Sequence, residues 1–213
     1  MRARRTKLSV VAVVLASLWT VLCSSDAAGA TGEFVTLKRY GLSFRPPSGW
    51  FAPDGGKMVE NLRKLDSEKE DLRAFLASHR GSIPIATYSQ HDPRGRKGII
   101  PTINVIGRPN PHQTFEAFEA MIAASSASRG AVLRNYAIKT APAARVIGGR
   151  RSVVFAAEYD ISTAAGDTYR VVGTTCAIPC GDIFLQISTS EAVPAQHHDL
   201  FERFFASFVF EKP

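Results

Sequence analysis

Alternating runs of apolar and polar residues recur along the chain and predict strands. The run from Phe34 to Arg45 alternates with an interruption near Gly41, and Pro46-Pro47 ends it because proline has no N–H to donate to a sheet. The segments IPIATYS (83–89) and GIIPTINVIG (98–107) are predicted as the next two strands. They are joined by HDPRGRKG, a loop too long and glycine-rich for a tight hairpin.

After residue 131 the pattern becomes that of an antiparallel meander. Gly148-Gly149, AAGD (164–167) and AIP (177–179) are the turn signals that separate short β-like runs. Five runs are predicted as strands: VLRNYAIK (132–139), AARVIG (143–148), RSVVFAAEYDIS (151–162), TYRVVGTTC (168–176) and DIFLQISTS (182–190).

Three segments place apolar residues at helical spacing. The first spans Met58 to His79, and the second, TFEAFEAMIAASSASRG (114–130), turns Phe115, Phe118 and Ile122 inward, with Met121 as an optional fourth. The third, AQHHDLFERFFASFVF (195–210), predicts a helix to about Phe205 and then a brief strand. The sequence therefore predicts an α+β fold with an antiparallel sheet flanked by helices.

The first thirty residues have the features of a signal peptide. A basic stretch precedes the apolar segment from Leu8 to Leu22, and Ala28-Gly29-Ala30 is a small-x-small cleavage pattern. We therefore expect an exported protein with a leader at 1–30, one domain at 31–213 and no transmembrane segment after cleavage. An uncleaved anchor is the alternative. Leu22 before Cys23 argues against a lipoprotein, because that position normally holds a small residue.

Charge excludes one large class of function. The chain carries 26 Lys and Arg against 19 Asp and Glu, and removing the leader leaves 22 against 18. A domain so mildly basic lacks the concentrated positive charge of a nucleic-acid-binding protein. Contact with an anionic surface of the cell envelope stays compatible with it.

Two cysteines lie beyond the leader, in the segment TTCAIPCGD. If Ala177-Ile178-Pro179 is a hairpin loop, the residues on either side face each other across the ladder. An exported chain then predicts a disulfide between Cys176 and Cys180. A metal pair and a redox dithiol are the alternatives, although redox motifs normally separate the sulfurs by two residues at the start of a helix.

Searches for catalytic and cofactor motifs find none. The sequence has no nucleophile elbow, phosphate loop, dinucleotide fingerprint or zinc-ligand spacing. No cofactor and no metal site are therefore predicted. His197-His198 is interpreted as a pair of surface histidines, because neighbouring residues on a helix point about 100° apart. A hydrolase assembled only in space, from His91, Asp92 or His112 with a serine, is the less favoured alternative.

Two features are candidates for contact with a partner. Arg94, Arg96 and Lys97 in the long loop can hold a phosphate or an acidic group, although solvated loop charge is the favoured interpretation. Trp50, the only tryptophan beyond the leader, is interpreted as core or rim packing, with ligand contact as the alternative.

The order of these elements resembles that of PsbP-like domains. YGLSFRPPSGW (40–50) resembles their opening strand and Pro-x-Gly-Trp turn, and FERFFASFVF (201–210) resembles their closing helix. The resemblance covers about 33–210. Within the family, the chain is most similar in character to exported bacterial members such as the DcrB-like envelope proteins. It implies an α/β/α sandwich used as a non-catalytic accessory or binding module. The paired cysteines and the basic loop depart from that pattern.

These observations together favour an exported, non-enzymatic protein that binds a protein or an envelope component. A carrier of a small ligand, with an apolar pocket between sheet and helices, is the second hypothesis.

Overall fold

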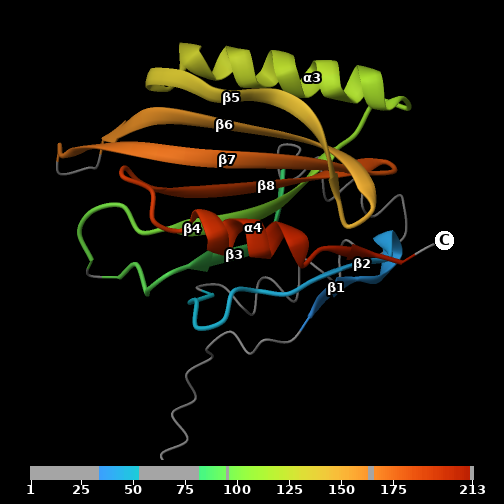
Figure 1. Ribbon diagram of the computed structural model, residues 1–213, viewed down its shortest axis with the longest axis horizontal. Helices are drawn as coiled ribbons and strands as arrows, with labels where there is room; N and C mark the ends of the chain where they lie inside the picture. Colours follow the sequence, from blue (N-terminus) through green and yellow to red (C-terminus); the bar gives the residue numbers. More distant parts are fainter. Residues whose placement is uncertain (1–33, 53–81, 95, 163–165, 212–213) are drawn as a thin grey trace, which may run out of the picture.

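The computed structural model describes residues 34–52, 82–94, 96–162 and 166–211, and these form a mixed α+β fold (Figure 1). Its main element is an antiparallel sheet of six strands in the order β3-β4-β8-β7-β6-β5. The strands are β3 (Ile83–Ser89), β4 (Thr102–Pro109), β5 (Arg134–Ile147), β6 (Arg150–Ser162), β7 (Thr168–Cys180) and β8 (Ile183–Ala192).

Strict alternation along the central strands divides the interior into two cores. On β7, Ala177 packs in one apolar cluster, whereas its neighbours Cys176 and Ile178 pack in the other. On β8, Phe184 joins Ala177, and Leu185 joins the opposite cluster. Because successive side chains of a strand point to opposite faces, the two clusters lie on opposite faces of one sheet.

Helix α3 (Phe115–Ser128) covers the first of these faces. Thr114 caps it, because the Thr114 hydroxyl accepts a hydrogen bond from the Ala117 N–H at 3.3 Å. Phe118, Ile122 and Ser126 are its buried residues, spaced four apart as one helical face requires. The helix predicted at 114–130 is therefore confirmed, and the short 3-10 helix η2 (Arg129–Ala131) follows it directly.

Helix α4 (His198–Ala206) and a small second sheet cover the opposite face. The small sheet has the order β1-β2-β9 and consists of β1 (Val35–Leu37), β2 (Leu42–Phe44) and β9 (Val209–Phe210). The 3-10 helix η1 (Lys38–Tyr40) and Gly41, at φ +55°, interrupt the first run as predicted. Phe44 stacks on Phe208 with ring centroids 4.8 Å apart, which fastens the two ends of the described chain together.

The meander differs from the prediction at two places. The first two predicted runs form the single strand β5, so the meander has four strands instead of five. Pro142 lies inside β5 because β5 is the last strand of the sheet, where a missing N–H breaks no ladder bond. The helix predicted from Met58 to His79 lies outside the described residues.

The predicted disulfide is wrong. Ala177-Ile178-Pro179 is no hairpin loop, because β7 continues through it and the turn falls at Gly181, at φ +72°, and Asp182. Cys176 and Cys180 therefore lie on one strand, four residues apart, and both are free and buried. Four residues of strand span roughly 13 Å, about twice the Cα separation that a disulfide tolerates.

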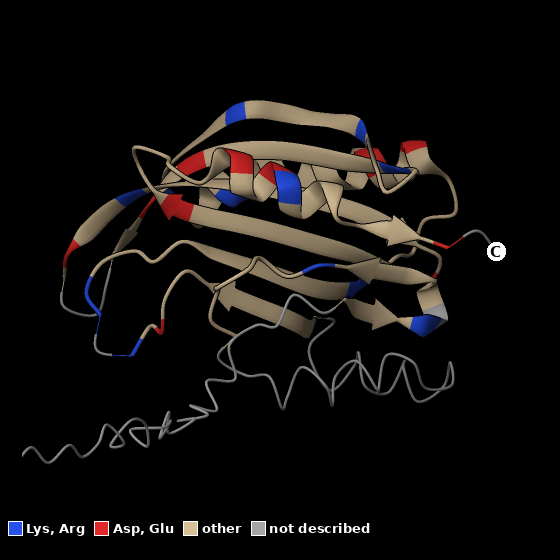
Figure 2. Cartoon of the chain, turned by 60° about the horizontal axis from the view of Figure 1, so that its bottom comes forward, with Lys and Arg blue, Asp and Glu red and all other residues tan. Residues whose placement is uncertain are grey.

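Neither described helix has the length and hydrophobicity needed to cross a membrane. Basic and acidic residues are dispersed along the described elements in the cartoon of Figure 2.

Candidate functional site

The face under α3 holds the candidate site, because α3 covers only part of it. α3 packs on Val153 and Phe155 of β6, Ala177 of β7 and Phe184 of β8. Continuing across the same face toward β4, Phe184 pairs with Arg108 and Gln186 pairs with Ile106. Residues that pair in register share a face of the sheet, so this row extends beyond the edge of the helix.

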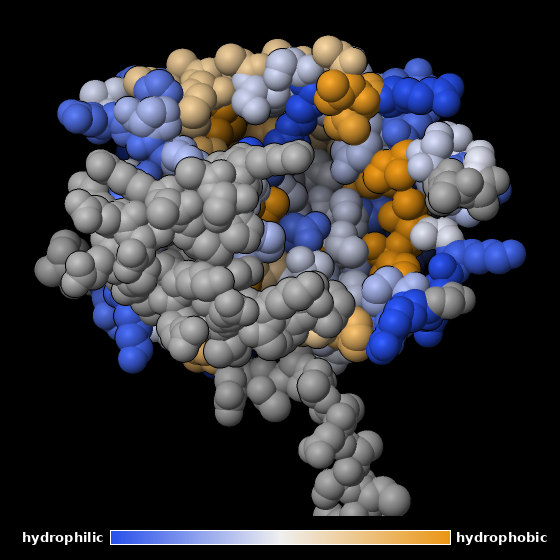
Figure 3. Space-filling model, turned by 180° about the vertical axis from the view of Figure 1, so that it is seen from behind, coloured by the Kyte–Doolittle hydropathy of each residue, from blue (hydrophilic) through white to orange (hydrophobic). Residues whose placement is uncertain are grey.

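We call the resulting hollow the arginine cleft. It is a cavity of about 470 Å³ between α3 and the sheet. Its charged side chains are Arg108 and Arg129, its polar ones are Ser125, Thr175 and Gln186, and its apolar ones are Pro109, Pro111, Met121, Ile122, Phe155, Ala177 and Phe184. Seen from behind, the surface is hollowed beneath the upper layer, and both hydrophilic and hydrophobic residues surround the hollow (Figure 3).

Arg108 reaches the cleft from the end of β4. It is half-buried, and its Nε atom is fully buried without a hydrogen-bond partner in the part of the chain that the structure describes. Burial lowers the pKa of Arg108, and the nearby positive charge of Arg129 lowers it further. An unpaired, partly desolvated cation therefore stands at one wall of the cleft, at a cost in free energy.

Arg129 reaches the same cleft from the C-terminal end of α3. Its guanidinium carbon lies 5.0 Å from the centre of the Phe155 ring, and its Nη1 donates to the Thr175 hydroxyl at 3.4 Å. These contacts hold the side chain against the sheet by a cation–π interaction and one long hydrogen bond. Neither contact neutralises its charge.

The positive charge of Arg129 affects the pKa of two nearby tyrosines, Tyr136 and Tyr159. Burial raises the pKa of Tyr136 and of Tyr159, while the positive charge of Arg129 opposes the rise in both. The two rings stack with centroids 6.5 Å apart, and the Tyr136 hydroxyl is buried without a partner among the described residues. The surroundings of Arg129 are thus aromatic, and the charged side chain that shares its cavity is another cation, Arg108.

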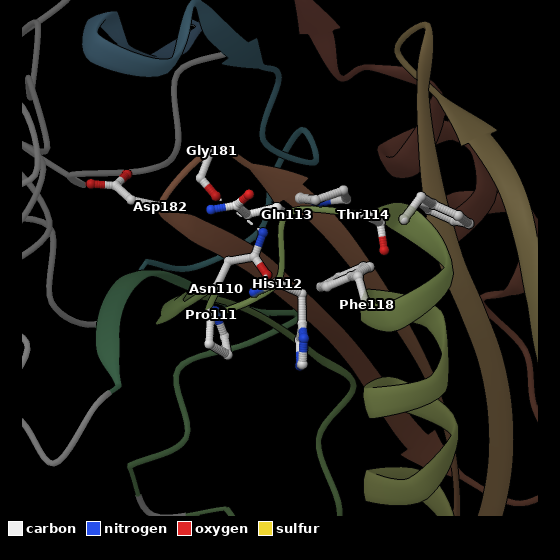
Figure 4. Close-up of a pocket in the computed structure, with 10 residues that line it drawn as sticks. Asn110, Pro111, His112, Gln113, Thr114, Phe118, Gly181 and Asp182 are labelled. Carbon is white, nitrogen blue, oxygen red and sulfur yellow. Dashed lines mark hydrogen bonds between the residues drawn. The ribbon is translucent and has the colours of Figure 1, made fainter.

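A second pocket adjoins the cleft at the start of α3 (Figure 4). It has a volume of about 590 Å³ and shares Pro111 with the cleft. Asn110 fixes its shape, because the Asn110 amide donates to the Gly181 carbonyl at 3.0 Å and its Oδ1 accepts from the His112 N–H at 3.3 Å. The connection after β4 is thereby tied to the turn between β7 and β8.

The predicted basic loop is partly neutralised from within. Arg94 binds Asp92, and its Nη2 lies 2.6 Å from Oδ2 of that carboxylate. The hydrogen bonds and the charge of Arg94 lower the pKa of Asp92. Arg96 and Lys97 are exposed. The structure does not bring this loop into the arginine cleft.

Trp50 lies in the core on the α4 side of the sheet, with 4% of its surface exposed. Its ring makes edge contacts with His197 and Phe201, at centroid distances of 6.1 Å in both cases. His197 is not the surface histidine expected, because its Nδ1 lies 2.9 Å from the buried carboxylate of Glu191 and its Nε2 lies 3.0 Å from the Gln90 amide. Glu191 also accepts from the His197 N–H at 3.1 Å, so this cluster anchors the start of α4.

The residues of the hydrolase alternative do not meet. Asp92 is engaged by Arg94, His91 is exposed on the same loop, and His112 lines the second pocket. Within the described ranges, no hydrogen bond joins a serine hydroxyl to a histidine ring.

Sequence reasoning missed both arginines of the cleft. The alternation in TINVIGRP places Arg108 on the face of Asn104 and Ile106, but no local signal says that this face borders a cavity. Arg129 reads as an ordinary cation at the end of a helix. Only the strand order and the position of α3 bring the two together.

No protein family model and no curated protein matches this chain. Two solved structures share part of its architecture. LpqN, a protein involved in cell envelope biogenesis of Mycobacterium tuberculosis, is 14% identical over 60% of this chain and 72% of its own, with a TM-score of 0.41. PA94 of Pseudomonas aeruginosa, a protein of unknown function, is 12% identical over 60% of this chain and 82% of its own, with a TM-score of 0.39. Likeness at this level carries no argument about function.

Proposed function

We propose that this protein is an exported, non-catalytic binding protein whose ligand is a small amphipathic anion held in the arginine cleft. The observation that carries the proposal is a pair of arginines without carboxylate partners in the described chain, facing one cavity with largely apolar walls. A partly buried charge without a partner carries a desolvation cost, and an anion that pairs with it offsets that cost on binding.

The composition of the cleft sets the kind of ligand. Met121, Ile122 and Phe184 offer apolar contact area to a hydrocarbon tail, while Arg108 and Arg129 offer charged donors to a head group. Charged hydrogen bonds between guanidinium and oxyanions are stronger than neutral ones, so the head group fixes the orientation.

The remaining parts of the proposal come from the sequence. Export rests on the leader predicted at 1–30, and the lack of catalysis rests on the missing catalytic motifs. A sheet with a helix on each face is compatible with the PsbP-like resemblance, and we include that kinship in the proposal. An envelope component with an anionic head group agrees both with the export that the leader predicts and with the positive charge of the cleft.

Calorimetric titration of the purified protein with eight-carbon ligands tests this function. We expect the anions octanoate, octyl sulfate or octyl phosphate to bind, and uncharged octanol to bind at least about tenfold more weakly, since a charge-assisted hydrogen bond contributes ~1.5–3 kcal/mol. Mass spectrometry should recover the bound ligand unchanged. If none of the three anions binds, or octanol binds equally well, the proposed function is wrong.

A further inference from the structure

The two arginines of the cleft have no carboxylate partner in the described chain. Four described arginines pair with acidic side chains, and the pairs are Arg94–Asp92, Arg145–Glu202, Arg151–Glu116 and Arg170 with both Glu158 and Asp160. Among the described residues, no carboxylate lies within ion-pair distance of Arg108 or Arg129, and none lines the cleft. The cleft thus holds two positive charges that no carboxylate of the described residues balances.

The two guanidinium groups also have donors to spare. Among the described residues, the Nε–H of Arg108 is buried without a hydrogen-bond partner, and Arg129 makes one hydrogen bond, at 3.4 Å, through Nη1. Ser125 and Gln186 stand at the same cleft with further polar groups. Planar guanidinium groups match the oxygens of phosphate and carboxylate alike, but only phosphate has three terminal oxygens to share between two arginines.

The net charge of the head group distinguishes phosphate from carboxylate more sharply than its geometry does. A carboxylate balances one of the two positive charges and leaves the other, on a partly buried arginine, without an anionic partner. A phosphate monoester carries close to two negative charges above its second pKa of about 6. In a cleft walled by apolar and aromatic groups the remaining imbalance is costly, so the doubly charged head is favoured.

We infer that the head group of the ligand is a phosphate monoester held between Arg108 and Arg129, with its apolar tail along Met121, Ile122 and Phe184. This inference rests on the proposed function and narrows it to one class of anion. Free inorganic phosphate shares the head-group chemistry but has no tail to bury.

The test compares ligands at pH 8 by calorimetry. Octyl phosphate should bind about tenfold or more tightly than octyl sulfate, which has three terminal oxygens but a single charge, and than octanoate. It should also bind more tightly than inorganic phosphate, because burying each CH₂ contributes about 0.8 kcal/mol.

Each outcome separates the two proposals. If octanoate or octyl sulfate binds as tightly as octyl phosphate, the phosphate inference is overturned and the amphipathic anion stands. If inorganic phosphate equals octyl phosphate, the head group stands and the amphipathic ligand of the proposed function is wrong. If no anion binds, both are wrong.

Variants locate the binding site. Arg108→Gln and Arg129→Gln should each weaken octyl phosphate about tenfold and reduce its preference over octyl sulfate. Arg203→Gln is the matched control, since Arg203 is an exposed residue of α4, on the opposite face of the sheet, and this variant should bind like the unchanged protein. Melting curves of all three variants establish that they are folded. Folded cleft variants with unchanged affinity would place the ligand elsewhere and overturn the inference.

Discussion

Cys176 and Cys180 show how a single residue's setting decides its chemistry. Burial raises the pKa of both thiols to about 12, so both are protonated at neutral pH. A protonated, buried thiol is neither a nucleophile nor a metal ligand. In this fold the two cysteines act as small apolar residues of the core on the α4 side.

This setting makes the two thiols resistant to chemistry in the native protein. We expect iodoacetamide to alkylate Cys176 and Cys180 in guanidinium but not in the native state at pH 8, as measured by mass spectrometry of tryptic peptides. Adding a reductant should leave the melting temperature unchanged, because no bond between them is broken. A lower melting temperature under reducing conditions would reinstate the disulfide.

Among the elements, the turn between β5 and β6 depends most closely on backbone space. Gly148 has φ +56°, and a Cβ there would lie 2.5 Å from the Phe208 carbonyl oxygen. The turn therefore presses against the chain just before β9, and only a glycine fits. Gly149, at φ +83°, has open space around it instead.

These two glycines form a matched pair for mutation. Gly148→Ala should lower the free energy of unfolding by about 3 kcal/mol, because a strained φ is combined with a backbone collision. Gly149→Ala should cost about 1 kcal/mol, because only the strain applies. Urea denaturation of both variants measures the difference. Equal losses would mean that β9 does not pack against the turn.

At the scale of the whole molecule, the two cores share the central strands of one sheet. Alternate residues of β7 and β8 point into the α3 core and into the α4 core. Neither core can lose its strands without exposing the other. We therefore expect the described domain to unfold as one cooperative unit.

A substitution that destabilises one core should then also lower the melting temperature reported by a probe in the other core. Phe118→Ala removes a ring packed on Phe184 in the α3 core and should destabilise the protein by ~3–5 kcal/mol. Trp50, in the α4 core, should report the same lowered melting temperature by fluorescence as circular dichroism does for the whole sheet. A fluorescence transition that stays unchanged would show that the cores unfold separately.

The sequence by itself determined the local elements. Period-two alternation placed β3 and β6 closely, and Phe115, Phe118 and Ile122 at helical spacing placed α3, because these signals act between near neighbours along the chain. The end of β7 was misjudged, because Pro179 and its neighbours read as a turn. In the sheet Pro179 instead pairs with Phe184, and the strand reverses only at Gly181.

Only the tertiary structure decided the arginine cleft. Arg108 and Arg129 belong to a strand and a helix end that no local pattern relates. They meet because β4 pairs with β8 and because α3 stops short of covering that side of the sheet. The electrostatic free energy of two like charges in one cavity depends on the distance between them and on their burial. Both quantities are set by the folded structure and cannot be read from local sequence patterns.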